Sequence, residues 1–152
     1  MLVSSIGIKL IKHWEKLRLL SYQDMRGIWT IGWGSTGRGN YPHRISSVQA
    51  DHFLKEDIRD VEKVLNHIIT TVVLQTEFDA LASWVFNIGG TRAKKSTLIK
   101  RLNAKAPRKD VASEFLRWNW ATLDSGEKVQ VPGLTNRREM ERQLFLTGKL
   151  PI

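Results

Sequence analysis

The chain's hydrophobic pattern changes once, and that change limits the folds open to it. Strand-forming residues dominate positions 17–41 and are broken by turn signals at 24–27 and 34–40. From residue 46 onward, apolar residues recur at helical spacing. In a chain of 152 residues, this order predicts an α+β fold with a small antiparallel sheet lobe and a larger helical lobe.

Local signals mark where several helices begin and end. Ser46-x-x-Gln49 forms a capping box, and Thr76-x-x-Asp79 offers a second cap. Gly89 follows a segment that is apolar on most sides, which is typical of a buried central helix. The predicted helices are 5–15 or 16, 46–67, 78–88, 96–103, one from about 110 to 120, and a last one capped by Asn136-x-x-Glu139 that ends before Gly148.

Charge narrows the partners that the chain can have. Its net charge is +9 and its isoelectric point is about 10.1, which favours an anionic partner such as nucleic acid, a membrane surface or a cell wall. Basic residues are densest at 92–101 and 137–142. There is no cysteine, and the four histidines show no metal-ligand spacing, so no metal or cofactor is expected.

The N-terminal segment lacks the features of a signal peptide for export. Lys9 and Lys12 interrupt its apolar run, and no small-residue cleavage pattern follows. No segment approaches the roughly 20 apolar residues that a membrane-spanning helix needs. We therefore expect a protein made in the cytoplasm, without a signal peptide and without stable membrane insertion.

Two carboxylates near the N-terminus suggest a chemistry. Glu15 ends the first predicted helix, Asp24 lies in a turn and Thr30 follows in a strand. Small and aromatic residues surround them, as a sugar-binding cleft requires, and a pair of carboxylates is the minimum equipment for cleaving a glycosidic bond. From spacing alone the alternative stays open that Glu15 pairs with an arginine and Asp24 caps a turn.

The sequence motifs around these residues resemble those of the phage-type lysozymes and endolysins. The segment from Ser21 to Gly37, SYQDMRGIWTIGWGSTG, resembles the family most closely. Further motifs follow in the family's order over nearly the whole chain. They are Gly7-x-x-Leu10-Ile11-Lys12, Phe78-Asp79-Ala80-Leu81, Phe86-Asn87-Ile88-Gly89, Ser96-Thr97-Leu98, Leu102-Asn103, Phe115-Leu116-Arg117-Trp118, Pro132-Gly133-Leu134 and Arg137-Arg138-x-x-Glu141.

The resemblance implies roles for the three polar residues. Glu15 is expected to donate the proton, Asp24 to assist at the other face of the sugar, and Thr30 to help hold the attacking water. It also implies a lysozyme-like fold over residues 1–152, with the sheet lobe at about 17–45 and the cleft between the lobes. The substrate-binding positions that it implies are Thr36, Phe86 and Thr97.

The same resemblance implies an ion pair, and it shows two positions at which this chain differs from many members of the family. Either Arg137 or Arg138 is expected to pair with Glu15. Many relatives have glycine after the catalytic glutamate, where this chain has Lys16, so a positive φ there would strain the backbone. Many also have histidine where this chain has Ser35, so a local ion pair of relatives is expected to be lost.

The leading hypothesis is a monomeric muramidase that binds no nucleic acid. It would hydrolyse the β-1,4 bond between N-acetylmuramic acid and N-acetylglucosamine in anionic peptidoglycan, after release from the cytoplasm. A lytic transglycosylase acting on the same bond is one alternative, although it needs no water-positioning groups. A basic nucleic-acid-binding domain would explain the charge but not the carboxylates. A non-enzymatic wall-binding domain is the last alternative.

Overall fold

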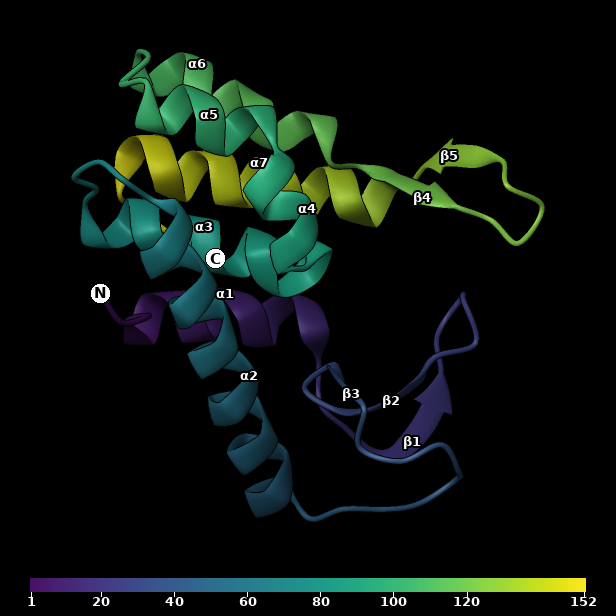
Figure 1. The fold of residues 1–152 in the computed structure, drawn as a ribbon. Coiled ribbons are helices and arrows are strands. Elements are labelled where there is room, and N and C mark those ends of the chain that lie inside the picture. Colours follow the sequence, from purple (N-terminus) through teal and green to yellow (C-terminus); the bar gives the residue numbers. More distant parts are fainter.

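The computed structural model describes all 152 residues and has two parts (Figure 1). The first helix leads into a small sheet, and the remaining helices follow. The elements are α1 (Ser5–Glu15), β1 (Arg18–Gln23), β2 (Trp29–Gly32), β3 (Ser35–Thr36), α2 (Ser47–Ile68), α3 (Gln75–Ile88), α4 (Gly90–Lys95), α5 (Thr97–Asn103), α6 (Arg108–Ser113), η1 (Glu114–Arg117), β4 (Trp120–Thr122), β5 (Lys128–Gln130) and α7 (Pro132–Thr147).

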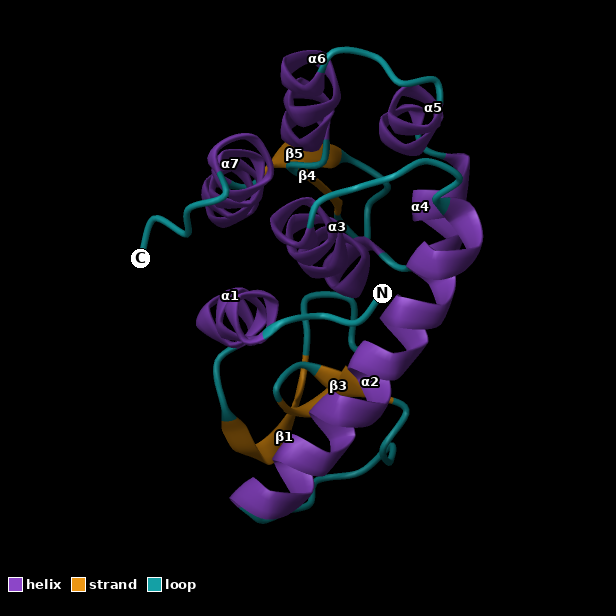
Figure 2. Cartoon of the chain, turned by 90° about the vertical axis from the view of Figure 1, so that its left-hand side faces the viewer, coloured by secondary structure: helices purple, strands orange, loops and turns teal.

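The predicted α+β fold is confirmed. Strands β1, β2 and β3 form an antiparallel sheet in chain order, because each follows the last through a short turn. The long helix α2 runs from the sheet to the other helices, as the two ribbon views agree (Figures 1 and 2). Ser46 caps α2 through the predicted capping box, and its hydroxyl accepts a hydrogen bond from the backbone N–H of Gln49 at 3.1 Å.

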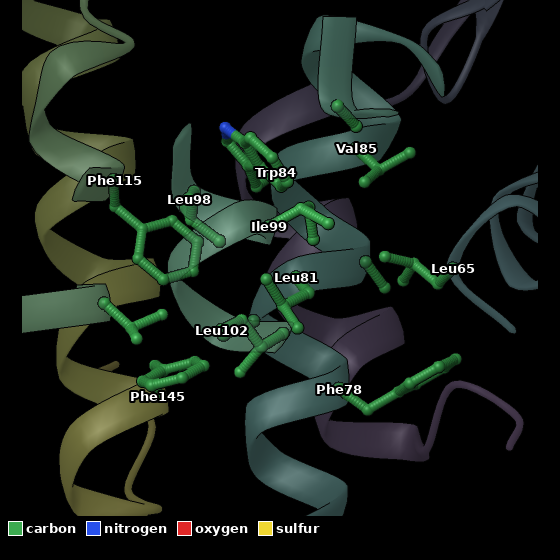
Figure 3. Packing of buried hydrophobic residues seen from close by; sticks show 14 of the residues in the cluster. Leu65, Phe78, Leu81, Trp84, Val85, Leu98, Ile99, Leu102, Phe115 and Phe145 are labelled. Carbon is green, nitrogen blue, oxygen red and sulfur yellow. The ribbon is translucent and has the colours of Figure 1, made fainter. Parts of the chain in front are cut away.

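Helix α3 is the centre of the helical lobe. It packs against α1, α2 and α7, and all nine of its residues from Glu77 to Val85 are buried. Trp84 and Phe115 meet edge to face with ring centroids 6.0 Å apart, and Phe115 meets Phe145 at 5.7 Å (Figure 3). Such aromatic pairs add about 0.5–1.5 kcal/mol beyond the burial of their area. The apolar character of α3 on most sides therefore reflects a helix enclosed by others.

The predicted cap of α3, Thr76 with Asp79, lies two residues too late in the chain. The carboxylate of Glu77 accepts the backbone N–H of Leu74 at 2.7 Å, so α3 begins at Gln75. Asp79 lies inside the helix, fully buried, and accepts both the backbone N–H and the hydroxyl of Ser4. A buried carboxylate needs such donors, so Asp79 anchors the start of α1, the helix that carries Glu15 at its other end.

The prediction of one helix from about 110 to 120 is also wrong. The helical segment ends after α6 and η1, and the hairpin of β4 and β5 follows, turning at Gly126 with a φ of 86°. Helix α7 begins at Pro132, whose fixed φ suits a first helical turn, and not at Asn136. Glu139 then lies inside α7 and pairs with Arg142 at 2.9 Å. No helix is both long enough and apolar enough to cross a membrane.

Candidate active site

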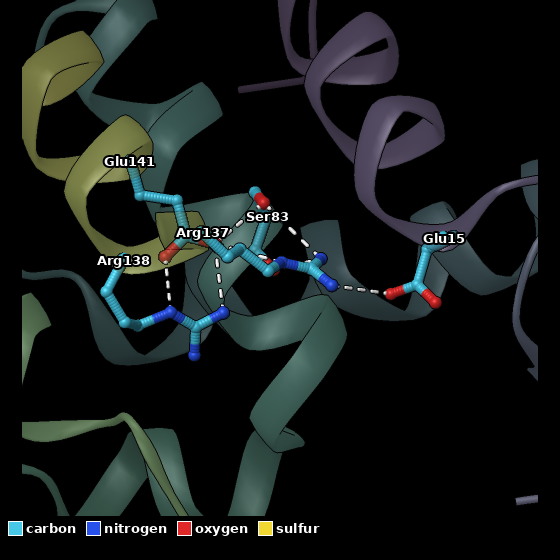
Figure 4. Close-up of polar contacts among 5 residues, drawn as sticks. All are labelled: Glu15, Ser83, Arg137, Arg138 and Glu141. Atoms are coloured by element: carbon cyan, nitrogen blue, oxygen red, sulfur yellow. Dashed lines mark hydrogen bonds and ion pairs between the residues drawn. The ribbon is translucent and has the colours of Figure 1, made fainter. Parts of the chain in front are cut away.

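Glu15 lies where the two lobes meet. It is the last residue of α1, and its side chain is 18% exposed. Arg137 of α7 donates from Nη1 to its Oε1 at 2.8 Å (Figure 4). The negative end of α1 disfavours a charged carboxylate at this position, and the guanidinium compensates for it. The choice that the sequence left open therefore falls on Arg137, whereas Arg138 points into the interior.

The turn between β2 and β3 passes close to Glu15. Gly34 has a φ of +78°, and a Cβ built on it would lie 2.9 Å from the carboxyl carbon of Glu15. Only glycine permits both the backbone conformation and this close approach. Gly34 and Arg137 thus confine the Glu15 carboxyl from opposite lobes.

Asp24 occupies the turn between β1 and β2. Its Oδ1 accepts the backbone N–H groups of Arg26 at 2.8 Å and Ile28 at 2.9 Å, so Asp24 does cap a turn. Its Oδ2 has no hydrogen-bond partner within the chain and is free to meet a water or a ligand. The capping interpretation and the catalytic one are therefore compatible, because they use different oxygens.

Thr30 lies on β2, directly opposite Tyr22 of β1. It is buried, and its hydroxyl donates to the carbonyl of Ile28 at 3.1 Å. Burial raises the pKa of Tyr22, and the nearby Glu15 and Asp24 carboxylates raise it further. The phenol therefore stays protonated and can donate a hydrogen bond within the site.

Two cavities are each lined by a residue that approaches Glu15. The larger, of about 520 Å³, is lined by Asp24 and Arg137 together with side chains of α3, α4 and the β4–β5 hairpin. The smaller, of about 230 Å³, is lined by Gly34, Thr36 and Phe86 among others. Gly34 belongs to the wall of the smaller cavity and Arg137 to that of the larger, so the Glu15 carboxyl adjoins one wall residue of each cavity but lines neither.

The structure brings most of the predicted residues together, with two exceptions. Arg138 is fully buried and lines neither cavity. Thr97 is exposed at the start of α5 and lines neither cavity. The prediction missed Asn87 and Arg92, and it missed the hairpin that brings Trp120 into the wall of the larger cavity. The Ser-Gly turn between the residues that form β4 and β5 was the signal that could have revealed the hairpin.

Ser35 connects strand β3 to helix α2. Its hydroxyl donates to Asp57 Oδ2 at 2.6 Å, and Arg38 pairs with Asp57 Oδ1 at 3.3 Å. Strand β3 therefore stays tied to α2 by a hydrogen bond and a neighbouring ion pair. The connection between sheet and helix does not depend on an imidazole. No three His, Asp or Glu side chains gather as a metal site would require.

Lys16 has the strained backbone that its replacement of glycine predicts. Its φ is 56° and its ψ is 144°, a region in which glycine is by far the commonest residue. We expect Lys16→Gly to raise the free energy of unfolding by about 1 kcal/mol, because relief of about 1–3 kcal/mol of strain exceeds the entropic cost of glycine. Lys9→Gly, inside α1, should instead lower it by about 1 kcal/mol. Denaturant unfolding of both variants measures the effect, and equal destabilisation would contradict it.

The fold and this cleft define a lysozyme-like protein. Residues 12–141 match the model of the phage lysozyme family, and the chain belongs to that family. It is 41% identical to an endolysin of Acyrthosiphon pisum secondary endosymbiont phage 1, over 94% of this chain and 97% of that protein.

Two solved structures resemble this chain along almost their whole length. An endolysin from the Escherichia coli O157:H7 phage FAHEc1 has a TM-score of 0.91 and 37% identity, covering 100% of this chain and 98% of that one. The muramidase domain of SpmX from Asticaccaulis excentricus has a TM-score of 0.86 and 32% identity, covering 95% and 97%.

Proposed function

We propose that the protein is an endolysin-type muramidase. It hydrolyses the β-1,4 bond between N-acetylmuramic acid and N-acetylglucosamine in peptidoglycan. One observation carries this proposal: Arg137 holds the shielded carboxyl of Glu15, and Arg137 and Asp24 line the same cavity. Membership of the phage lysozyme family and the muramidase domain among its structural neighbours support the same activity.

In this mechanism Glu15 is the general acid. It gives its proton to the glycosidic oxygen as the bond breaks, and Arg137 stabilises the carboxylate that remains. The free Oδ2 of Asp24 accepts a proton from the attacking water on the opposite face of the sugar. Thr30 helps to orient that water. The phenol of Tyr22, which stays protonated, is a further donor close to the Glu15 carboxyl.

The two cavities bind the sugars on either side of the scissile bond. Thr36 and Phe86 contact a sugar in the smaller cavity, one through its hydroxyl and one through its ring. Trp120, about half exposed, offers a stacking surface beside the larger cavity. Thr97 contacts only longer glycans, because it lines neither cavity.

The basic surface favours binding to the anionic wall. Positions 91–109 hold eight Lys and Arg residues and no Asp or Glu. Most of these side chains are exposed, and Arg92 reaches the larger cavity. We propose a monomeric single-domain enzyme that needs no cofactor and binds no nucleic acid, made in the host cytoplasm and acting on the wall after release.

Product analysis tests this function. Digested peptidoglycan should carry new N-acetylmuramic acid reducing ends, formed first as the α-anomer, because the proposed water-positioning set gives inversion. NMR of the first-formed anomer, with mass spectrometry of the fragments, measures this. A first-formed β-anomer would make Asp24 a nucleophile. A 1,6-anhydro end would identify a transglycosylase, and the absence of any new N-acetylmuramic acid end would overturn the proposal.

A further inference from the structure

A group of buried charges lies directly behind the contact between Arg137 and Glu15. Glu141 of α7 is fully buried, and its Oε1 accepts from Ser83 Oγ at 2.8 Å, Arg138 Nη2 at 3.1 Å and Arg137 Nε at 3.3 Å (Figure 4). Its Oε2 lies 2.8 Å from Arg138 Nε. One carboxylate therefore holds both arginines and fixes the guanidinium that reaches Glu15.

This arrangement is costly for folding. The side chain of Arg138 is 0% exposed, and its Nη1 has no hydrogen-bond partner. Its Nε and Glu141 Oε2 are within ion-pair distance but form no hydrogen bond. Burial lowers the pKa of Arg138, although Glu141 opposes that shift. Buried ionic clusters often contribute less to stability than apolar residues of the same volume. Stability alone therefore gives little reason for Arg138 to be an arginine.

The charges of the cluster affect Glu15. Arg137 and Arg138 carry two positive charges and Glu141 carries one negative charge, so one net positive charge faces the Glu15 carboxyl. Without Arg138, Glu141 would neutralise Arg137 and compete for its guanidinium. Burial lowers the pKa of Arg138, and the Glu15 carboxylate opposes that shift slightly, after the stronger effect of Glu141.

We propose that Arg138 and Glu141 are positioning residues that set the charge presented to Glu15, and with it the pH range in which Glu15 keeps its proton. The proposal rests on the proposed function in that Glu15 is the general acid. On the sheet side, Glu15 faces Tyr22, whose ring lies 4.3 Å from the Arg18 guanidinium and close to Asp24. Those three groups stay unchanged in the variants below.

Two single variants should move the pH–activity profile in opposite directions. Arg138→Met removes a positive charge, so the alkaline limb of kcat/KM should move to higher pH. Glu141→Gln removes a negative charge, so the limb should move to lower pH. Each shift should be about 0.5–1 pH unit, less than the 1–3 units of a charge in direct contact. A purely structural role would reduce activity in both variants without displacing the limbs oppositely.

The double variant Arg138→Met/Glu141→Gln should return the limb to its wild-type position, since Arg137 alone then supplies one positive charge. Arg138→Lys keeps the positive charge, so the alkaline limb should stay at its wild-type position. Glu141→Gln leaves Arg138 buried without its charged partner and can fail to fold for that reason. In that case the comparison of Arg138→Met with the double variant decides the question, because both of these variants lack the Arg138 guanidinium. Shifts in the same direction, or an unmoved limb in Arg138→Met, would overturn the proposal.

Titration of the Glu15 carboxyl by carbon-13 NMR in the free protein separates this proposal from the catalytic one. The midpoint for Glu15 should move as the limb does, whether or not the protein cleaves peptidoglycan. Opposite midpoint shifts without any lysis would support the electrostatic coupling and refute the enzymatic function. Unchanged midpoints in an active enzyme would refute the coupling alone.

Discussion

Glu15→Gln should abolish lysis of wall preparations while the protein stays folded. Glutamine keeps the shape of the side chain, and its amide oxygen can still accept the hydrogen bond from Arg137. It has no proton to give the glycosidic oxygen, so the rate should fall by about 10²–10⁴. Turbidity of wall suspensions measures lysis, and circular dichroism verifies the fold.

Glu139→Gln is the matched control. Glu139 makes an ion pair with Arg142 on the exposed side of α7, and its side chain is 42% exposed. The same chemical change there should leave lysis near the wild-type rate, because exposed pairs contribute little. A Glu15→Gln variant that retains more than about a tenth of the activity, outside the range for a lost general acid, would exclude Glu15 from that role.

Gly34→Ala should cost about 10²-fold in activity. Its added methyl group would collide with the Glu15 carboxyl and push it from the position set by Arg137. Misplacing a catalytic group by about 1 Å is enough for a loss of that size. The expected change is a fall in kcat, measured on soluble peptidoglycan fragments under conditions where the variant is folded.

Gly37→Ala separates collision from backbone strain. Gly37 has a φ of +70°, close to the +78° of Gly34, but a Cβ on Gly37 would meet no atom within 4 Å. Both alanine variants should lose similar stability, of order 1 kcal/mol, because both place a side chain at positive φ. Only Gly34→Ala should lose activity, and equal activity in the two variants would contradict the proposed contact with Glu15.

Elements with strong local signals were predicted well. The Ser46 capping box, the glycine after α3 and the strand residues between 17 and 41 each determine structure through neighbours in sequence. The first residue of a helix was predicted badly where two residues could each cap it. Glu77 and Asp79 are both suitable acids, and only the packing of the N-terminus against α3 assigns Asp79 to Ser4.

Some features of the candidate site could likewise be predicted from the sequence, and others could not. Glu15, Asp24 and Thr30 could be found in the sequence because they belong to one continuous stretch of chain. The positive φ of Lys16 was expected only from the family resemblance, through the glycine that many relatives have there. The two oxygens of Asp24 could not be told apart. Their separate uses depend on how the turn folds around the side chain, which no spacing rule describes.

The sequence by itself determined the sheet lobe, most of the helices and the stretch of chain that carries the acid. Only the tertiary structure decided that Arg137, and not Arg138, reaches Glu15 across 122 residues of sequence separation. Adjacent residues on a helix point about 100° apart, so the rotation of α7 against α1 and α3 assigns one guanidinium to the cleft and the other to the core. That rotation depends on packing among α1, α3 and α7, which are distant in sequence, and packing of this kind leaves no local signal.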